Sequence, residues 1–218
     1  MQETPVQMRP LLRRSYTVSL TLCIGLAACC GASRIAAAEI DPAVARIRGF
    51  YDVLLDSMKS AQRLPVRARY EKLEPAVRAT FDLSVMTRIA VGSAWTSIRS
   101  EEQQALLDQF ARLTIATYAN RFDGYSGERF EVDPATETRG ENRIVHSTLV
   151  RPKGESIPLN YLVHSTGEGW KAIDVYLSGT ISELATRRSE FSALLRTGGP
   201  SALIDSLRQR ADKLLQPV

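Results

Sequence analysis

The chain has 218 residues, of which 44% are hydrophobic and 24% charged, and this composition excludes a wholly disordered protein. A formal net charge of +4 suggests an acidic partner, but residues 1–38 hold four of the 28 basic residues and only one of the 24 acidic residues. The remainder therefore has 24 basic and 23 acidic residues. Because this body is nearly neutral, we expect no nucleic-acid partner.

Residues 1–38 have the organisation of an export signal. Arg13 and Arg14 precede an uncharged apolar run at residues 16–28, and three alanines at residues 36–38 offer a cleavage site. The run is shorter than the roughly 20 residues that a membrane-spanning helix needs. We therefore expect an exported protein, with a signal peptide at residues 1–38 and one domain at residues 39–218.

A second processing route stays open. Residues 26–29 (LAAC) resemble a lipoprotein signal, in which Cys29 would carry the lipid and anchor the protein. The three cysteines, Cys23, Cys29 and Cys30, all lie in this leader. A body that begins at Glu39 would have none, so we expect no disulfide, cysteine nucleophile or cysteine-bound zinc there.

Two helices are expected near the start of the body and two at its end. Asp41-Pro42 predicts the start of the first helix and Leu64-Pro65 its end, and a second helix is expected at residues 66–79. A third is expected at residues 181–196, and a break at Gly198-Gly199-Pro200 precedes the last.

The segment of residues 81–125 is expected to form a short helix and a long one. Asp82 would cap the short helix, Gly92-Ser93 would end it, and Ser100 with Gln103 predicts a capping box for the long helix. The long helix carries an apolar arc wider than one core contact needs, formed by Leu106, Leu107, Phe110, Ala111, Leu113, Thr114, Ile115, Thr117, Tyr118 and Phe122. This surplus fits either a deeper core or a cavity for a large apolar ligand.

Four strands are expected between these helices, because apolar residues alternate there with period two. The strands are predicted at residues 129–132, 143–151, 157–165 and 170–177, with short Gly-, Pro- and Asn-containing turns between them. Consecutive strands with short connections form an antiparallel meander. The sequence therefore predicts an α+β fold, a single domain with a curved antiparallel four-stranded sheet packed against several helices.

The sequence offers little catalytic chemistry. His146 and His164 occupy corresponding places in two predicted strands and would be the best metal or hydrolase candidates, but half-exposed histidines are the commoner case, and we predict no metal and no cofactor. No phosphate-binding glycine loop or G-x-S-x-G pattern occurs. Arg187 and Arg188 could hold an anionic group, although solvated arginines are the more common case.

Three blocks of the sequence carry a resemblance to a known family. They are FDLSVMTRIAVGSAW, EEQQALLDQFARLTIATYANRFDGYSGE and WKAIDVYLSGTISELATRRSEFSALL. In this order they resemble the MlaC family, also called toluene-tolerance proteins, and GTISELATRRSEF is most similar to its hopanoid-associated HpnM branch. Ala185-Thr186-Arg187 departs from the Asn-Tyr-Arg of the MlaC branch, so head-group contacts do not carry over.

The resemblance implies a non-catalytic periplasmic carrier of phospholipid or a hopanoid-type lipid. Its partners would be an inner-membrane transporter complex and an outer-membrane lipoprotein complex. An apolar cavity would lie between the sheet and the helices, and the Gly92-Ser93 break is a candidate hinge. The implied lipid-binding residues are Phe81, Met86, Ile89, Trp95, Phe110, Leu113, Tyr118, Leu149, Leu159, Tyr161, Val163, Val175 and Leu177.

Two other functions stay open from the residues. The protein could be an accessory interaction subunit of an envelope complex, in which the wide apolar arc is only core. It could also be a periplasmic hydrolase that depends on His146 or His164.

Overall fold

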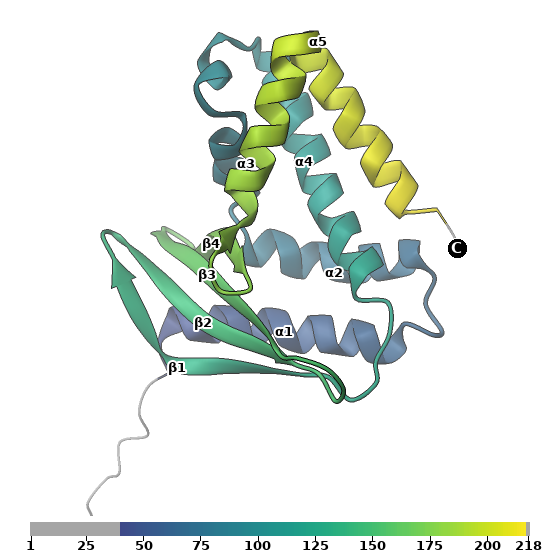
Figure 1. Ribbon diagram of the computed structural model, residues 1–218, viewed down its shortest axis with the longest axis vertical. Helices are drawn as coiled ribbons and strands as arrows, with labels where there is room; N and C mark the ends of the chain where they lie inside the picture. The colour runs from purple at the N-terminus through teal and green to yellow at the C-terminus, as the bar shows by residue number, and fades with distance from the viewer. Residues whose placement is uncertain (1–39, 217–218) are drawn as a thin grey trace, which may run out of the picture. The chain divides into compact units, whose positions relative to one another are not determined.

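The computed structural model describes residues 40–216 (Figure 1). The export signal and both of its processing routes lie outside the described residues and stay predictions. The described part is a compact α+β unit with these elements in chain order: α1 (Pro42–Ser60), α2 (Val66–Thr80), α3 (Leu83–Val91), the 3₁₀ helix η1 (Gly92–Ser97), α4 (Ser100–Arg121), β1 (Arg129–Arg139), β2 (Asn142–Val150), β3 (Ile157–Thr166), β4 (Gly169–Leu177), β5 (Ile181–Ser182) and α5 (Glu183–Leu214). None of the described helices has the length and apolar character of a membrane span.

The first helix begins as predicted, and the same cap ties it to the sheet. The Asp41 carboxylate accepts a hydrogen bond of 2.8 Å from the Ala43 N–H, and Pro42 lies in the first turn, where its missing N–H costs nothing. The other oxygen of the Asp41 carboxylate accepts a hydrogen bond of 2.6 Å from Arg143 Nη1 on β2. The start of α1 is therefore fixed against the strand that it crosses.

The segment of residues 81–125 folds as a short and a long helix, with one prediction wrong. Asp82 caps α3 by accepting from the Val85 N–H at 3.0 Å, and Gly92, with φ 71°, ends it. The capping box does not form, because Ser100 is already the first residue of α4. Gln103 Nε2 instead donates to the carbonyls of Trp95 and Ile98, which tie η1 to α4.

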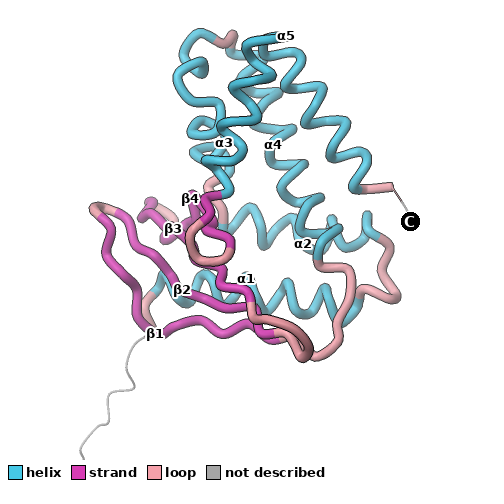
Figure 2. The backbone as a smooth tube through the Cα atoms, in the orientation of Figure 1, coloured by secondary structure: helices cyan, strands magenta, loops and turns pink. Residues whose placement is uncertain are grey.

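The sheet has five antiparallel strands in the order β1-β2-β3-β4-β5, not the predicted four. Figure 2 shows the strands β1 to β4 of this sheet. The fifth, β5, pairs with Tyr176 and Leu177 at the end of β4, and two residues are too short to show a period. The strand β1 is also longer than predicted. An irregularity in its pairing between Val132 and Thr136 lets it continue past Pro134 to Arg139.

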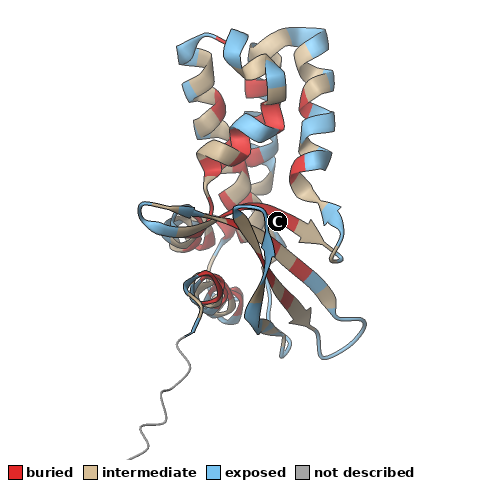
Figure 3. Cartoon of the chain, turned by 90° about the vertical axis from the view of Figure 1, so that its left-hand side faces the viewer, coloured by how far each residue is buried: buried red, intermediate tan, exposed pale blue. Residues whose placement is uncertain are grey.

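Alternation along the strands gives the sheet one face that joins the core. Val145, Tyr161 and Val175 lie opposite one another on β2, β3 and β4, and all three are buried. The helix α1 packs across this sheet, while α4 packs mainly on α2, α3 and α5. Buried residues line the contacts between these elements (Figure 3). Ile144, on the opposite face from Val145, is also buried, so both faces are at least partly covered.

The predicted break at Gly198-Gly199-Pro200 divides α5. Gly199 takes φ 68° and ψ −169°, which no helical residue adopts, and Pro200 follows. The two halves of α5 run in opposite directions from this kink, and the second half returns beside α4 (Figure 1).

Asp174 joins the sheet to the first half of α5. This carboxylate is buried, accepts from the N–H groups of Val175 and Leu184 at 2.8 and 3.1 Å, and accepts from Ser182 Oγ at 2.5 Å. Ser182 Oγ in turn accepts from the Ala185 N–H at 2.9 Å and caps the helix. One aspartate therefore sets the direction in which α5 leaves the sheet.

We expect Asp174→Ala to lower the free energy of unfolding by about 1–3 kcal/mol, because it leaves buried donors without an acceptor. Urea denaturation of the purified protein measures this loss. Asp205→Ala is the control: its carboxylate pairs with Arg208 on the surface, and such pairs contribute less than about 1 kcal/mol. Equal losses in the two variants would contradict the role given to Asp174.

Candidate functional site

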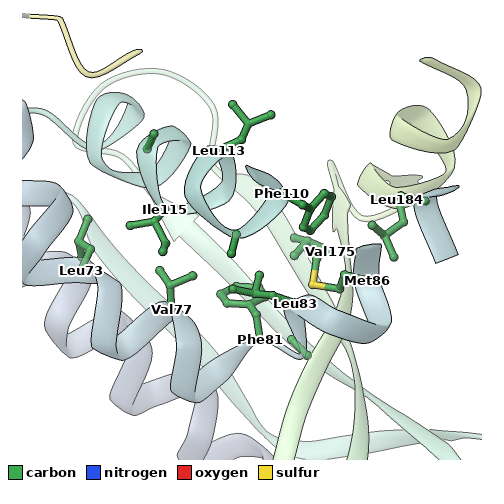
Figure 4. Packing of buried hydrophobic residues seen from close by; sticks show 14 of the residues in the cluster. Leu73, Val77, Phe81, Leu83, Met86, Phe110, Leu113, Ile115, Val175 and Leu184 are labelled. Carbon is green, nitrogen blue, oxygen red and sulfur yellow. The ribbon is translucent and has the colours of Figure 1, made fainter. Parts of the chain in front are cut away.

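A cavity of about 470 Å³ lies between α4, the ends of the inner strands and the first turns of α5. Four of its apolar side chains, Met86, Phe110, Val175 and Leu184, come from four different elements and lie close together (Figure 4). The full lining is Phe81, Met86, Phe110, Thr114, Thr117, Tyr118, Arg121, Phe122, Leu149, Ile157, Leu159, Tyr161, Val175, Leu177, Ser178, Glu183, Leu184 and Arg187.

The register of the sheet brings its share of this lining into one patch. Leu149 on β2 faces Ile157 on β3, and Leu159 on β3 faces Leu177 on β4. Cross-strand partners point to the same face, so the patch is continuous from β2 to β4. The sheet therefore supplies a smooth apolar floor for the cavity.

Aromatic rings form the inner end of the cavity. The ring centroids of Phe81 and Tyr118 lie 5.6 Å apart, those of Phe81 and Tyr161 lie 6.2 Å apart, and Phe50 packs edge-on against both Phe81 and Tyr118. Aromatic pairs at these distances stabilise one another beyond the area that they bury. This end of the cavity is consequently a rigid wall.

The hydroxyl groups near this wall stay neutral. Burial raises the pKa of Tyr51 to about 12, against the opposing effect of its hydrogen bond of 2.7 Å with Ser147 Oγ. Burial also raises the pKa of Tyr118 and of Tyr161 well above that of a free tyrosine. No tyrosinate forms here at neutral pH, so this part of the cavity carries no charge.

Polar groups lie on the α4 and α5 sides. The hydroxyl groups of Thr114 and Thr117 donate to carbonyls of their own helix at 2.9 and 2.7 Å, so they place no unmet donor in the cavity. Charge comes from Arg121, Glu183 and Arg187. Burial lowers the pKa of Arg187, and Glu183 and Glu190 oppose this shift. Because an arginine does not lose its proton in a protein, the Arg187 side chain is charged at neutral pH.

Nine of the thirteen predicted site residues line the cavity: Phe81, Met86, Phe110, Tyr118, Leu149, Leu159, Tyr161, Val175 and Leu177. Four do not. Leu113 and Val163 are buried in the packed core, and Ile89 is 38% exposed. Trp95 lies in η1, where Arg88 packs over its ring at 5.8 Å. Whether the nine contact a lipid stays a prediction.

Some lining residues were missed although the sequence contained a signal for them. Thr114, Thr117 and Phe122 belong to the apolar arc of α4, and Ile157 alternates with Leu159 on β3. Arg121, Ser178 and Glu183 gave no such signal, since only the meeting of α4 with the start of α5 brings them together.

The two histidines are not the cross-strand pair that their positions suggested. Arg143 faces Val163 in the β2–β3 register, so His146 and His164 lie at different levels of the sheet. His146 Nε2 is 3.2 Å from Glu137, and His164 Nε2 is 3.0 Å from the capping residue Asp82. Among residues 40–216, no three His, Cys, Asp or Glu side chains gather as metal ligands would.

The family model described as "MlaC protein" matches residues 49–209, and the chain belongs to this family. The fold is also similar to that of the phospholipid-binding protein from Ralstonia solanacearum, whose structure was solved in complex with a phospholipid. The TM-score is 0.70 at 24% sequence identity, over 80% of this chain and 99% of the other. No curated protein matches the chain.

Because the buried tyrosines titrate at high pH, the free energy of unfolding depends on pH in the alkaline range. Well below pH 10.0 the Tyr51 hydroxyl is neutral in both the folded and the unfolded state, whereas between this pH and about 12 it ionises in the unfolded chain first. Stability should then fall with rising pH, by up to about 1.4 kcal/mol per pH unit for each such group.

We expect the Tyr51→Phe variant to lose stability less steeply over this range, as measured by urea denaturation at a series of pH values. Tyr125→Phe, which changes a ring that is already 42% exposed, should keep the slope of the unmodified protein. The same slope in the Tyr51→Phe variant would show that this hydroxyl is not held neutral.

Proposed function

We propose that the protein is a non-catalytic carrier that holds a lipid in the cavity between α4 and the sheet. The observation that carries this proposal is the cavity itself. Protein interiors pack closely, with few voids larger than a water molecule, yet about 470 Å³ remains here with a mostly apolar lining. Ligand cavities of roughly 300–1,000 Å³ with such linings bind apolar molecules.

The energetic benefit of such a cavity follows from the hydrophobic effect. Each methylene group of a lipid tail costs about 0.8 kcal/mol when it is exposed to water. Burial against Leu149, Leu159 and Leu177 removes this cost without a covalent step. The similar Ralstonia solanacearum protein, described as phospholipid-binding, supports a lipid as the occupant.

The setting of the carrier is proposed from the family and from the leader. Export to the periplasm, and transfer between an inner-membrane transporter complex and an outer-membrane lipoprotein complex, fit a protein that shields a membrane component in water. The cargo would be a phospholipid or, if the resemblance to the HpnM branch extends to function, a hopanoid-type lipid. The nine predicted residues on the lining are its proposed contacts.

Mass spectrometry of an organic-solvent extract tests the proposal. Protein purified without detergent from the cells that naturally produce it should release lipid in near-stoichiometric amount. A lipid-free extract, together with co-purification of an envelope complex, would overturn the carrier function in favour of an accessory interaction subunit.

A substitution in the floor of the cavity should remove lipid binding. We expect Leu159→Asp to reduce the bound lipid at least tenfold, because a carboxylate there would lose its hydration on contact with a lipid tail. Ile89→Asp, on α3, is the control: its side chain is 38% exposed and does not line the cavity, so this variant should bind lipid normally.

A second variant avoids burying a charge. Thr117→Trp adds bulk to the lining without a carboxylate, and it should reduce bound lipid while circular dichroism shows an unchanged fold. Normal lipid content in both the Leu159→Asp and Thr117→Trp variants would place the ligand elsewhere.

A further inference from the structure

Three tyrosine hydroxyl groups gather at the inner end of the apolar cavity. Tyr118 on α4 and Tyr161 on β3 line the cavity, and the ring of Tyr51 on α1 lies 5.8 Å from that of Tyr161. Burial is the main cause that raises the pKa of Tyr161, and hydrogen bonding with the hydroxyl groups of Tyr51 and Tyr118 adds to it. The cavity therefore has a cluster of uncharged polar groups at one end.

A backbone carbonyl fixes which of these groups donates. The buried Ser147 Oγ donates its one proton to the carbonyl oxygen of Leu159. In the hydrogen bond of 2.7 Å between Ser147 Oγ and the Tyr51 hydroxyl, the donor must then be Tyr51. Because Tyr51 has no proton left for Tyr161, its oxygen can only accept a hydrogen bond from that side.

Two proton arrangements remain for Tyr118 and Tyr161. If Tyr161 donates to Tyr51 and Tyr118 donates to Tyr161, every hydroxyl proton of the cluster has an acceptor. If Tyr161 donates to Tyr118 instead, the Tyr118 proton is left without an acceptor in the cluster, and an unmet buried donor is costly. The first arrangement is therefore the more stable one. It leaves the lone pairs of the Tyr118 oxygen as the group that the cluster offers to the cavity.

The other hydroxyl groups of α4 on the lining have the same polarity. Thr114 and Thr117 donate to carbonyls of their own helix at 2.9 and 2.7 Å, so they too offer the cavity oxygen lone pairs and no proton. The uncharged polar side chains of α4 consequently accept hydrogen bonds from a ligand and donate none to it. A ligand group that carries a proton matches them, whereas a carbonyl group does not.

We propose that the Tyr118 oxygen accepts a hydrogen bond from a hydroxyl group on the apolar body of the bound lipid. The inference rests on the proposed carrier function and names its cargo class: a lipid whose tail or ring system carries an alcohol, rather than a plain hydrocarbon or a ketone. Such a hydroxyl group loses its hydration when it enters the cavity, and this loss is costly unless an acceptor compensates it. Tyr118 supplies the acceptor.

The test compares lipids that differ only in one substituent of one acyl chain. The purified protein is incubated with vesicles of isotope-labelled phosphatidylcholines whose chain is plain, hydroxylated or carries a ketone, with the substituent near the start, the middle or the end of the chain. The vesicles are removed, and mass spectrometry quantifies the retained lipids. At one position or more, we expect the hydroxylated lipid to be favoured on the order of fivefold over the other two, as for one net hydrogen bond between neutral groups.

Two variants test the order of the protons. Tyr118→Phe combined with Tyr161→Phe removes the acceptor, leaves Tyr51 donating to Ser147, and should lose most of the preference while the fold persists. Tyr161→Phe alone removes the acceptor of the Tyr118 proton, so Tyr118 becomes a donor to the cavity. This variant should retain the ketone lipid as well as the hydroxylated one.

The control changes a tyrosine of similar burial. Tyr70→Phe alters a half-buried ring on α2 that does not line the cavity, and it should keep the full preference for the hydroxylated lipid. Because the selectivity of the unmodified protein is measured in the same experiment, the inference can be refuted even if a variant fails to fold.

The outcomes separate the two proposals. Retention of none of the lipids would refute the carrier function itself. Equal retention of all three kinds at every position, or a preference for the ketone in the unmodified protein, would overturn the hydroxyl inference and leave the carrier function standing. The same follows if the double variant keeps the preference, or if Tyr161→Phe still discriminates against the ketone.

Discussion

An antiparallel sheet with one apolar face must cover that face, and here the helices cover it incompletely. The helix α1 packs directly across the sheet, but α4 packs mainly on other helices. The helix α4 therefore covers the floor formed by Leu149, Leu159 and Leu177 without packing directly on it, and a cavity of about 470 Å³ remains between the layers. The rest of the structure holds this separation open.

Two features maintain the spacing. The aromatic cluster around Phe81, Tyr118 and Tyr161 fills the inner end with rigid rings, so the layers cannot close there. At the other end, Asp174 binds the backbone N–H of Leu184 and directs the first half of α5 away from the sheet. An apolar floor, a rigid end and a fixed helix together make the cavity a property of the fold. The charged residues of the lining, Arg121, Glu183 and Arg187, lie where α4 ends and α5 begins.

Much of this fold could be predicted from the sequence, because local signals govern it. Asp41 and Asp82 cap the helices that they were expected to cap, and Gly92 and Gly199 adopt conformations that end or bend a helix. The long-range features were harder to predict. The strand β5 has no period, and Gln103 donates to carbonyls that become available only once η1 forms.

The candidate site shows the same difference between features that local sequence signals predict and features that depend on long-range contacts. Nine of the eighteen lining residues were named from the sequence, through the resemblance to the MlaC family, and periodicity on β3 and α4 supports four of them: Leu159, Tyr161, Phe110 and Tyr118. Periodicity could not separate Val163, which completes the core, from neighbours such as Phe110 and Tyr161, which also face the cavity. Whether a buried apolar residue borders a void depends on what packs opposite it. Arg187 was considered from the sequence as a residue that could hold an anionic group, but Arg121 was not, because only the fold brings the two to one cavity.

A crystal structure of the protein, purified without detergent or delipidation, tests the central claim most directly. We expect continuous electron density for a lipid tail along the floor between Leu149 and Leu177, beneath α4. A cavity closed by repacked side chains, or lipid density only outside it, would contradict the claim that this gap between helices and sheet exists to hold a lipid.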